Sequence, residues 1–367
     1  MEDTMRFTCN VAELNDALSI AIHAIPVKSP KLVLEGILME AADSSVMLTS
    51  TDMTIGIECK VQAYVEEKGS VVLPGRFFCE IARKLPGENV RITVNERSIA
   101  NIESGFFKTS LAGSDALEFP ELPVVKGQTV SMSQKKLKRL LNGTMFAVAT
   151  DESRPVLTGC LFEVNEKEIS VVALDGYRLA ICKETLDDVF DKLSHVIGGK
   201  VLGDIAKILN DSDDEVSICF SKSHACVRID ENMVIARLLE GEFIRYNQIL
   251  PTEFVTKIVL NRMRLVDALD RAMLIGRESK STLVTFKIEE NQMTILMQHT
   301  SMEEKMEILS QGKYIEIAFN VKYVLDVLKA IPDDEIEMRF KSNVSPCLIY
   351  PTDGGDQYLY LVLPVRV

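Results

Sequence analysis

Residues 198–210 read GGKVLGDIAKILN and have the apolar spacing of one short amphipathic helix. At 3.6 residues per turn, Lys200, Asp204 and Lys207 fall on one face. Leucine and isoleucine side chains occupy the opposite face, which suits packing on a core. The segment therefore predicts a helix whose solvated face alternates in charge.

Two further segments repeat this pattern, PGRFFCEIARKLP at residues 74–86 and NVKYVLDVLKAIP at residues 320–332. Each again carries a basic residue at i, an acidic residue at i+4 and a basic residue at i+7. A single face of this kind is common on solvated helices, because an i,i+4 ion pair contributes only about 0.2–0.5 kcal/mol. Three copies, 124 and 122 residues apart, indicate an internal repeat.

The chain length fits three repeats. Its 367 residues divide into thirds within the usual domain size of about 100–200 residues. Matching residues recur 123 positions apart, as in Gly36 and Gly159 or Asp52 and Asp175. We predict three domains, at residues 1–125, 126–251 and 252–367.

Each third is predicted to run helix, strands, helix, strands. The expected helices span residues 11–25, 74–86, 133–147, 198–210, 261–275 and 320–332. Alternating apolar and polar side chains predict roughly two dozen short strands, one of them ISVVALDGYRLAI at residues 169–181. The predicted fold class is α+β, with three tandem similar domains that each pack two helices on antiparallel sheets.

The composition predicts a cytoplasmic protein. Hydrophobic residues make up 47% of the chain, but no apolar run approaches the roughly 18 residues that cross a bilayer. The first ten residues are polar and mixed in charge, so we expect no signal peptide. The eight cysteines form no CxxC motif and several lie in apolar runs, which predicts reduced core thiols.

Charge is unevenly distributed along the chain. The formal net charge of −13 argues against a conventional nucleic-acid binder, whose basic surface neutralises phosphates. The six predicted helices, however, carry +7 in total, so the remaining residues carry −20. This segregation of basic helices from an acidic remainder is more informative than the average.

The sequence lacks the motifs of catalytic and metal sites. It contains no P-loop, dinucleotide-binding glycine motif, HExxH or GxSxG, and its four histidines are scattered singly. The acidic run from Asp211 to Glu215 has Val216 and Lys222 where a calcium loop needs glycine and glutamate. We therefore predict no catalytic residue, no bound metal and no cofactor.

Three segments carry a resemblance to a known family: ALDGYRLAICKE at residues 173–184, FNVKYVLDVLKAIP at 319–332 and YLYLVLPVRV at 358–367. They resemble the β subunit of bacterial DNA polymerase III, the sliding-clamp family, and the resemblance covers Met5 to Val367. It implies a head-to-tail homodimer that forms a six-domain ring around double-stranded DNA, without sequence preference. The implied role is non-catalytic: tethering the polymerase confers processivity. The implied partners are the replicative polymerase, an ATP-dependent clamp loader, and repair and translesion polymerases that bind through short linear motifs.

A ring of this kind would explain the charge segregation. Basic helix faces turned toward the channel would meet phosphates, and an acidic exterior would repel them. Phosphate contacts carry no sequence information, which suits sliding. Any one basic residue fits a solvated surface equally well, but as a set we expect DNA contacts in the channel from Lys28, Arg76, Arg83, Lys138, Arg139, Arg154, Lys200, Lys207 and Arg271.

The resemblance also implies a pocket between the second and third domains for partner peptides with glutamine and bulky apolar residues. An apolar C-terminal segment without a binding role would leave an apolar edge exposed, which favours a partner site. The segment could also pack simply as the last strand of a sheet. The chain departs from the commonest family pattern at Tyr177, Ile244, Gln248 and Pro346, which leaves the peptide preference open. The pocket residues implied are Leu157, Leu174, Gly176, Tyr177, Arg178, Leu179, Ile244, Gln248, Ile249, Asn320, Tyr323, Val344, Pro346, Leu361, Val362, Leu363, Pro364, Val365 and Arg366.

Ring closure is expected to join domain one of one chain to domain three of the other. By position, the candidates are Phe107 on a late strand of the first domain and Leu274 and Ile275 near the end of a helix. An apolar helix end fits internal core equally well.

Two other functions are compatible with the residues. One is a homo-oligomeric cytosolic enzyme with a site between repeats and a reactive cysteine such as Cys182, although no activating histidine stands close in sequence. The other is an acidic scaffold that binds no DNA.

Overall fold

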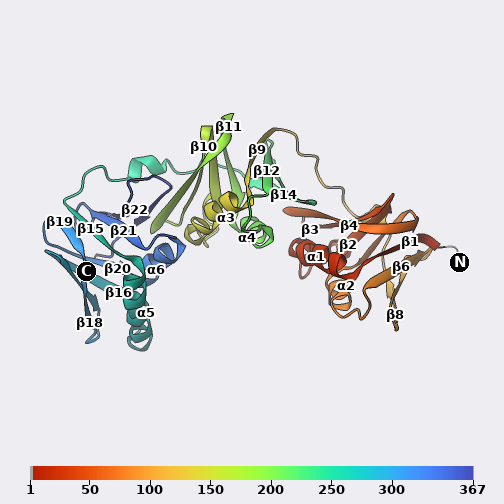
Figure 1. Ribbon diagram of the computed structural model, residues 1–367, viewed down its shortest axis with the longest axis horizontal. Helices are drawn as coiled ribbons and strands as arrows, with labels where there is room; N and C mark the ends of the chain where they lie inside the picture. Colours follow the sequence, from red (N-terminus) through yellow and green to blue (C-terminus); the bar gives the residue numbers. More distant parts are fainter. Residues whose placement is uncertain (1–2, 367) are drawn as a thin grey trace. The chain divides into compact units, whose positions relative to one another are not determined.

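The computed structural model describes residues 3–366, in which six α-helices alternate with 23 β-strands (Figure 1). The fold class is α+β, as predicted. The helices are α1 (Val11–Ala21), α2 (Gly75–Ala82), α3 (Gln134–Asn142), α4 (Gly199–Ile208), α5 (Arg262–Ser279) and α6 (Val321–Ala330). All six coincide with predicted helices. Short 3-10 turns at Ile22–Ala24 and Met145–Ala147 complete the predicted spans 11–25 and 133–147.

The packing of the chain divides it into two compact units. Unit 1 comprises residues up to 134 together with 207–238, and unit 2 comprises residues 135–206 together with those from 239 onward. Each unit holds one outer third and part of the central third.

Unit 1 contains antiparallel sheets and the helices α1 and α2, which lie side by side (Figure 1). Its strands are β1 (Asp3–Asn10), β2 (Gly36–Ala42), β3 (Ser45–Thr51), β4 (Ile55–Glu67), β5 (Gly69–Pro74), β6 (Asn89–Asn95), β7 (Ile99–Ser104), β8 (Phe107–Ala112), β9 (Gln128–Ser133), β12 (Glu215–Phe220), β13 (His224–Ile229) and β14 (Asn232–Leu239). Strand β14 pairs with β4, with Asn232 opposite Cys59, so one ladder links the first and central thirds.

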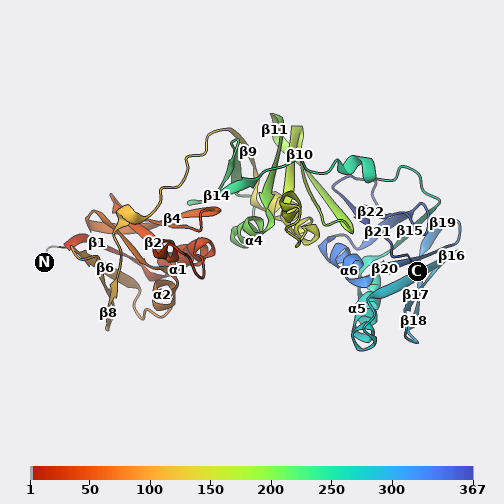
Figure 2. The ribbon, with the colours of Figure 1, turned by 180° about the vertical axis from the view of Figure 1, so that it is seen from behind.

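Unit 2 is built around the long hairpin of β10 and β11, and α5 packs beside α6 (Figure 2). Its strands are β10 (Gly159–Leu174), β11 (Arg178–Gly198), β15 (Thr256–Asn261), β16 (Leu283–Glu289), β17 (Gln292–Met297), β18 (Glu303–Glu307), β19 (Leu309–Gly312), β20 (Ile315–Asn320), β21 (Glu335–Phe340), β22 (Cys347–Pro351) and β23 (Tyr358–Val362). Strand β23 pairs with β11, with Arg178 opposite Val362, so a second ladder links the central and last thirds.

The prediction of one strand over residues 169–181 is wrong, because the chain reverses at Asp175–Tyr177 between β10 and β11. The Asp175 carboxylate accepts hydrogen bonds from the backbone N–H groups of Tyr177 and Arg178, at 2.9 and 3.0 Å. Gly176 has φ +90°, a conformation that favours glycine. The polar turn residues outweigh the apolar alternation on either side.

The face predicted for α4 is also partly wrong. Lys200 and Lys207 are exposed, but Asp204 is buried, with 7% of its surface accessible. It follows Val201 by three residues and precedes Ile205 by one, and both of these are buried. At the helical period it therefore lies at the border of the apolar face.

No helix among residues 3–366 is long and apolar enough to span a membrane.

Candidate functional site

Three segments of unit 2 meet around Arg178: the β10–β11 turn, helix α6 and the C-terminal tail. The backbone N–H of Leu363 donates to the carbonyl of Tyr177 at 2.8 Å. Two residues later, the N–H of Val365 donates to the carbonyl of Ala318 in β20, also at 2.8 Å. The tail after β23 is thus fixed at both the turn and the strand that leads into α6.

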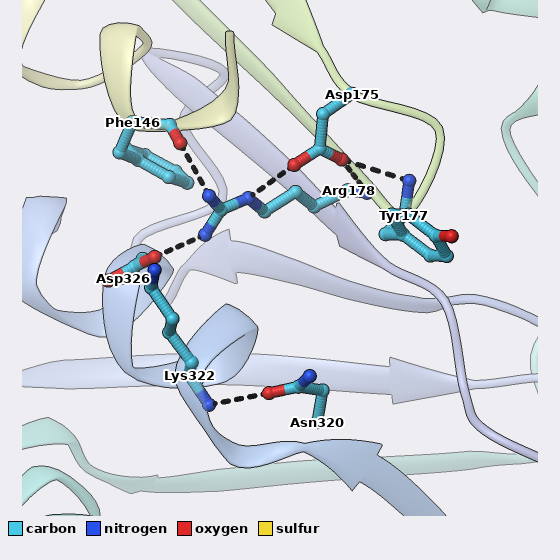
Figure 3. A network of polar contacts seen from close by, with 7 residues as sticks. All are labelled: Phe146, Asp175, Tyr177, Arg178, Asn320, Lys322 and Asp326. Atoms are coloured by element: carbon cyan, nitrogen blue, oxygen red, sulfur yellow. Dashed lines mark hydrogen bonds and ion pairs between the residues drawn. The ribbon is translucent and has the colours of Figure 1, made fainter. Parts of the chain in front are cut away.

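The Arg178 guanidinium joins these segments (Figure 3). Its Nε donates to Asp175 Oδ2 at 3.0 Å, Nη1 donates to Asp326 Oδ2 at 2.5 Å, and Nη2 donates to the carbonyl of Phe146 at 2.7 Å. Asp326 belongs to α6, and Phe146 to the 3-10 turn after α3. Arg178 retains 8% of its surface exposed, so these partners replace the water that a buried charge loses.

An aromatic pair lies beside the guanidinium. The rings of Tyr177 and Tyr323 are stacked with centroids 5.5 Å apart, and Arg178 Cζ lies 4.8 Å from the Tyr323 centroid. Burial is the main cause that raises the Tyr323 pKa, so the phenol is neutral at physiological pH. Asn320 begins α6, and its side chain accepts from the backbone N–H of Lys322 at 3.0 Å (Figure 3).

Apolar side chains of the predicted pocket share one core cluster. Leu157, Leu174, Leu179 and Leu361 are buried in it, and Ile244 and Leu363 pack against it half-buried. These residues come from five separate segments of the chain. The structure therefore brings this part of the predicted pocket together in unit 2.

The remaining predicted pocket residues lie in loops, turns and the tail. Gln248 and Ile249 belong to a 3-10 turn at Tyr246–Ile249, and Val344 and Pro346 belong to the loop before β22. Three of the predicted pocket residues expose apolar surface: Tyr177, Val344 and Ile249 are 58%, 56% and 47% exposed. Val362 is buried in β23, Pro364 and Val365 are half-buried, and Gly176 and Arg366 are exposed.

Sequence reasoning missed three members of the Arg178 network: Phe146, Asp175 and Asp326. Asp175 stands inside the segment ALDGYRLAICKE, and Asp326 is the acidic member of the repeated helix face, so both carried a signal. Phe146 contributes a backbone carbonyl, which no residue pattern reveals.

The residues predicted to contact DNA are mostly exposed. Arg76 and Arg83 lie on and directly after α2, Lys200 and Lys207 on α4, and Arg139 on α3. Lys138 is half-buried. Lys28 and Arg154 are exposed in loops, and Arg271 is exposed on α5.

Arg139 and Arg271, among these cations, have carboxylate partners. Arg139 pairs with Glu184, whose side chain is 5% exposed. Arg271 makes two hydrogen bonds to Glu304 of β18, at 3.0 and 2.5 Å. Both charges are thereby partly neutralised, which weakens their attraction for phosphate relative to an unpaired cation.

The candidate dimer residues are accessible. Phe107 at the start of β8 is 36% exposed, and Leu274 and Ile275 on α5 are 62% and 42% exposed. Phe106, which sequence reasoning did not select, is fully exposed beside Phe107. The alternative that the end of α5 is internal core is wrong at these two positions.

The structure gives no support to a cysteine enzyme. Cys182 is 5% exposed, and burial raises the pKa of its thiol to about 11. Its Sγ lies 3.4 Å from the Tyr360 hydroxyl. A thiol with this pKa stays protonated at neutral pH, whereas nucleophilic attack requires thiolate. Within residues 3–366, no group of three or more histidine, cysteine or carboxylate side chains is arranged to hold a metal.

Comparisons with known proteins match the whole chain. Models of the N-terminal, central and C-terminal domains of the DNA polymerase III beta subunit match residues 5–123, 131–244 and 247–366. The beta sliding clamps of Staphylococcus epidermidis and Staphylococcus aureus are 35% and 34% identical over 381 residues, covering 100% of this chain and 99% of theirs.

Solved structures agree. The DNA polymerase sliding clamp from Bacillus subtilis has a TM-score of 0.95 at 31% identity, and a putative DNA polymerase III beta subunit from Eubacterium rectale has 0.94 at 31%. Each likeness covers 99% of this chain and 100% of the other. The chain therefore belongs to the DNA polymerase III β-subunit family, and it is a sliding clamp, a non-catalytic subunit that confers processivity on the polymerase.

Proposed function

We propose that two copies of this chain, each with domains at residues 1–125, 126–251 and 252–367, close head to tail into a ring around duplex DNA. The replicative polymerase and other DNA-processing proteins then dock on the ring and remain tethered to the template. Enclosure retains the DNA, so the contacts to phosphate need to be neither tight nor sequence-specific.

The observation that carries this proposal is the exposure of basic side chains on helices of an otherwise acidic protein. Arg76, Arg83, Arg139, Lys200 and Lys207 are all exposed, while residues outside the six predicted helices carry −20. Cations gathered on helices attract a polyanion to those surfaces, and the acidic remainder repels it elsewhere.

Topological enclosure is tested on DNA circles. The protein is loaded onto nicked circular DNA by an ATP-dependent clamp loader, and the circle is then cut at one site. Protein that encircles DNA should stay bound to the uncut nicked circle and leave within minutes of linearisation, because only the linear molecule has ends over which a ring can slide off. Retention on the linear molecule would show adhesion instead of enclosure, and failure to load would favour an acidic scaffold that binds no DNA.

Partner docking is assigned to the surface of unit 2 around Tyr177, Tyr323 and the tail. Its apolar cluster and exposed rim suit short linear motifs with glutamine and bulky apolar residues. The proposed partners are the replicative polymerase, the clamp loader, and repair and translesion polymerases. Tyr177, Ile244, Gln248 and Pro346 depart from the commonest family pattern and would set the peptide preference.

For ring closure, the exposed apolar pair Phe106 and Phe107 in unit 1 is assigned to the partner's unit 2, near Leu274 and Ile275. Strand β18 is an edge strand of the four-stranded sheet in unit 2 and is open to pairing. We assign the protein to the cytoplasm, in keeping with eight free cysteines, seven of them buried.

A further inference from the structure

Arg178 lies within a column of aromatic contacts in unit 2, made by Tyr177, Tyr323, Phe146 and Tyr360. Tyr177 stacks on Tyr323 at 5.5 Å, and Arg178 Cζ lies 4.8 Å from the Tyr323 centroid. Arg178 Cζ also lies 5.3 Å from the Phe146 centroid, and the Phe146 ring is tilted by 47° against that of Tyr360 at 5.8 Å. One end of the set, Tyr177, is 58% exposed, and the other, Tyr360, is 1% exposed, so the contacts connect the surface with the core.

Each nitrogen of the guanidinium is engaged by the protein. Nε, Nη1 and Nη2 each donate to a partner on a different segment, and Cζ lies over the rings of Phe146 and Tyr323. Only 8% of the residue's surface is accessible. A peptide docked at this surface therefore meets Tyr177 and Tyr323 and finds almost no guanidinium surface.

We propose that Arg178 is a positioning residue: it holds Tyr323 against Tyr177 and thereby shapes the docking surface without donating to the docked peptide. This inference deepens the proposed docking function and rests on it. The physical basis is geometric. The planar fork of arginine binds Asp175 and Asp326 from one centre while its Cζ lies over the Tyr323 ring, and lysine cannot do both.

A double-mutant cycle separates positioning from direct contact. The affinity of the full-length protein is measured by fluorescence anisotropy with a labelled peptide of glutamine and bulky apolar residues. We expect R178K to weaken binding about fivefold to twentyfold, the range that loss of a cation–π contact and its coupling spans. In a Y323L background, R178K should weaken peptide binding by less than about twofold, because the ring that Arg178 positions is gone.

Equal factors in the two backgrounds would overturn the proposal, because a direct contact to the peptide does not depend on Tyr323. Unchanged affinity of R178K in the wild-type background would overturn it as well. D326N is a second variant, which removes one charged partner and leaves the arginine in place. It should weaken binding in the same direction by a smaller factor, and full wild-type affinity would count against the proposal.

Arg339 provides a matched control. It also stacks on aromatic rings in unit 2, 4.0 Å from the Tyr350 centroid and 5.7 Å from that of Phe254, and it pairs with Glu337. R339K removes the same kind of stacked arginine outside the column. It should leave peptide affinity within about twofold of the wild type, whereas a loss equal to that of R178K would indicate a general effect of destabilisation.

A readout without peptide tests the stack itself. Protein labelled with 3-fluorotyrosine gives fluorine signals that Y177F and Y323F assign, and the chemical shifts report the stacking of these rings. R178K should move both signals toward the values of a solvated tyrosine, and unmoved signals would overturn the proposal. If the wild type fails to bind the peptide, the docking function fails, and the fluorine signals alone decide whether Arg178 positions the tyrosines.

Discussion

Cys182 and Cys219 show how the surroundings of single residues decide their chemistry. Cys182 is buried beside Tyr360, and burial raises its thiol pKa to about 11. Cys219 is half-buried on β12 and is the one free cysteine of residues 3–366 that is not buried. Reactivity toward an alkylating reagent follows the accessible thiolate, so the two residues should differ strongly.

We predict that Ellman's reagent modifies about one thiol per native chain, at Cys219, and all eight after unfolding in guanidinium. The C219A variant should lose the reaction of the native protein, and C182A should keep it. A fast native reaction that disappears in C182A would revive the reactive-cysteine interpretation.

Buried thiols also make stability sensitive to alkaline pH. Burial raises the pKa of Cys9, Cys59 and Cys160 to about 12, and that of Cys182 to about 11, from an ordinary value of 9.0. In the unfolded chain these groups lose protons near pH 9, before the folded groups do. Folded-state stability is therefore complete below pH 9 and is lost as the pH rises toward 11 to 12.

The expected loss at pH 10 is about 1 kcal/mol for each of the four thiols. Urea unfolding at pH 8.0 and 10.0 measures it. C160A should reduce the difference between the two pH values by about 1 kcal/mol, and a free energy of unfolding that is equal at both would contradict the argument.

Part of the site was predictable at the level of single residues. The family resemblance selected Tyr177, Arg178, Asn320 and Tyr323. The structure places Tyr323 in contact with Tyr177 and Arg178, and Asn320 at the start of the helix that carries Tyr323. What the sequence could not show was the direction of Arg178, because a charged residue in a strand more often faces solvent. Its burial depends on the aspartate of a helix 148 residues away.

At the scale of elements, asparagine begins three of the helices. Asn10, Asn261 and Asn320 precede α1, α5 and α6, and each side chain accepts from backbone N–H groups of the first turn. The cap satisfies donors that the helix itself leaves unpaired. In α6 it also fixes the turn that carries Tyr323.

We predict that N320A lowers the free energy of unfolding by about 1 kcal/mol and weakens peptide binding severalfold. N10A removes the equivalent cap of α1. It should lower the free energy of unfolding by a similar amount and leave the peptide affinity unchanged. N320D keeps the capping oxygen and should retain binding. Weak binding of N320D with wild-type stability would mean that the amide itself contacts the peptide.

Element types were predicted better than element limits. The helical periodicity located all six helices, but α5 continues to Ser279, four residues beyond the predicted Ile275. No proline stops the helix before Ser279, and the helix ends where Lys280 adopts a positive φ. The turn inside residues 169–181 was missed because its flanks, Leu174 and Leu179, continue an apolar pattern that hides the reversal.

At the scale of the whole molecule, the distribution of charge is the property to test. Reversing Arg139 would place a new carboxylate beside buried Glu184 and destabilise the fold, so the variant should spare it. The set Arg83, Lys138, Lys200 and Lys207 samples three helical regions and leaves the Arg139–Glu184 pair in place.

We predict that R83E, K138E, K200E and K207E combined lower the fraction of loaded DNA circles at least about tenfold, because the basic surface that attracts phosphate is lost. The control combines K126E, K167E, K257E and K313E, four exposed lysines outside the helices, and changes the net charge equally. It should load normally. Equal loss in both variants, with unchanged oligomer mass, would mean that net charge matters and its location does not.

The β11–β23 ladder has a consequence for synthesis on the ribosome. Strand β23 follows β11 by about 160 residues, yet it pairs along the start of β11, with Cys182 opposite Tyr358. The hairpin of β10 and β11 is synthesised first and must wait with one edge open until residues 358–362 have emerged. The nascent chain therefore carries an unpaired apolar strand for almost half its length, and chaperones have most to protect at that edge.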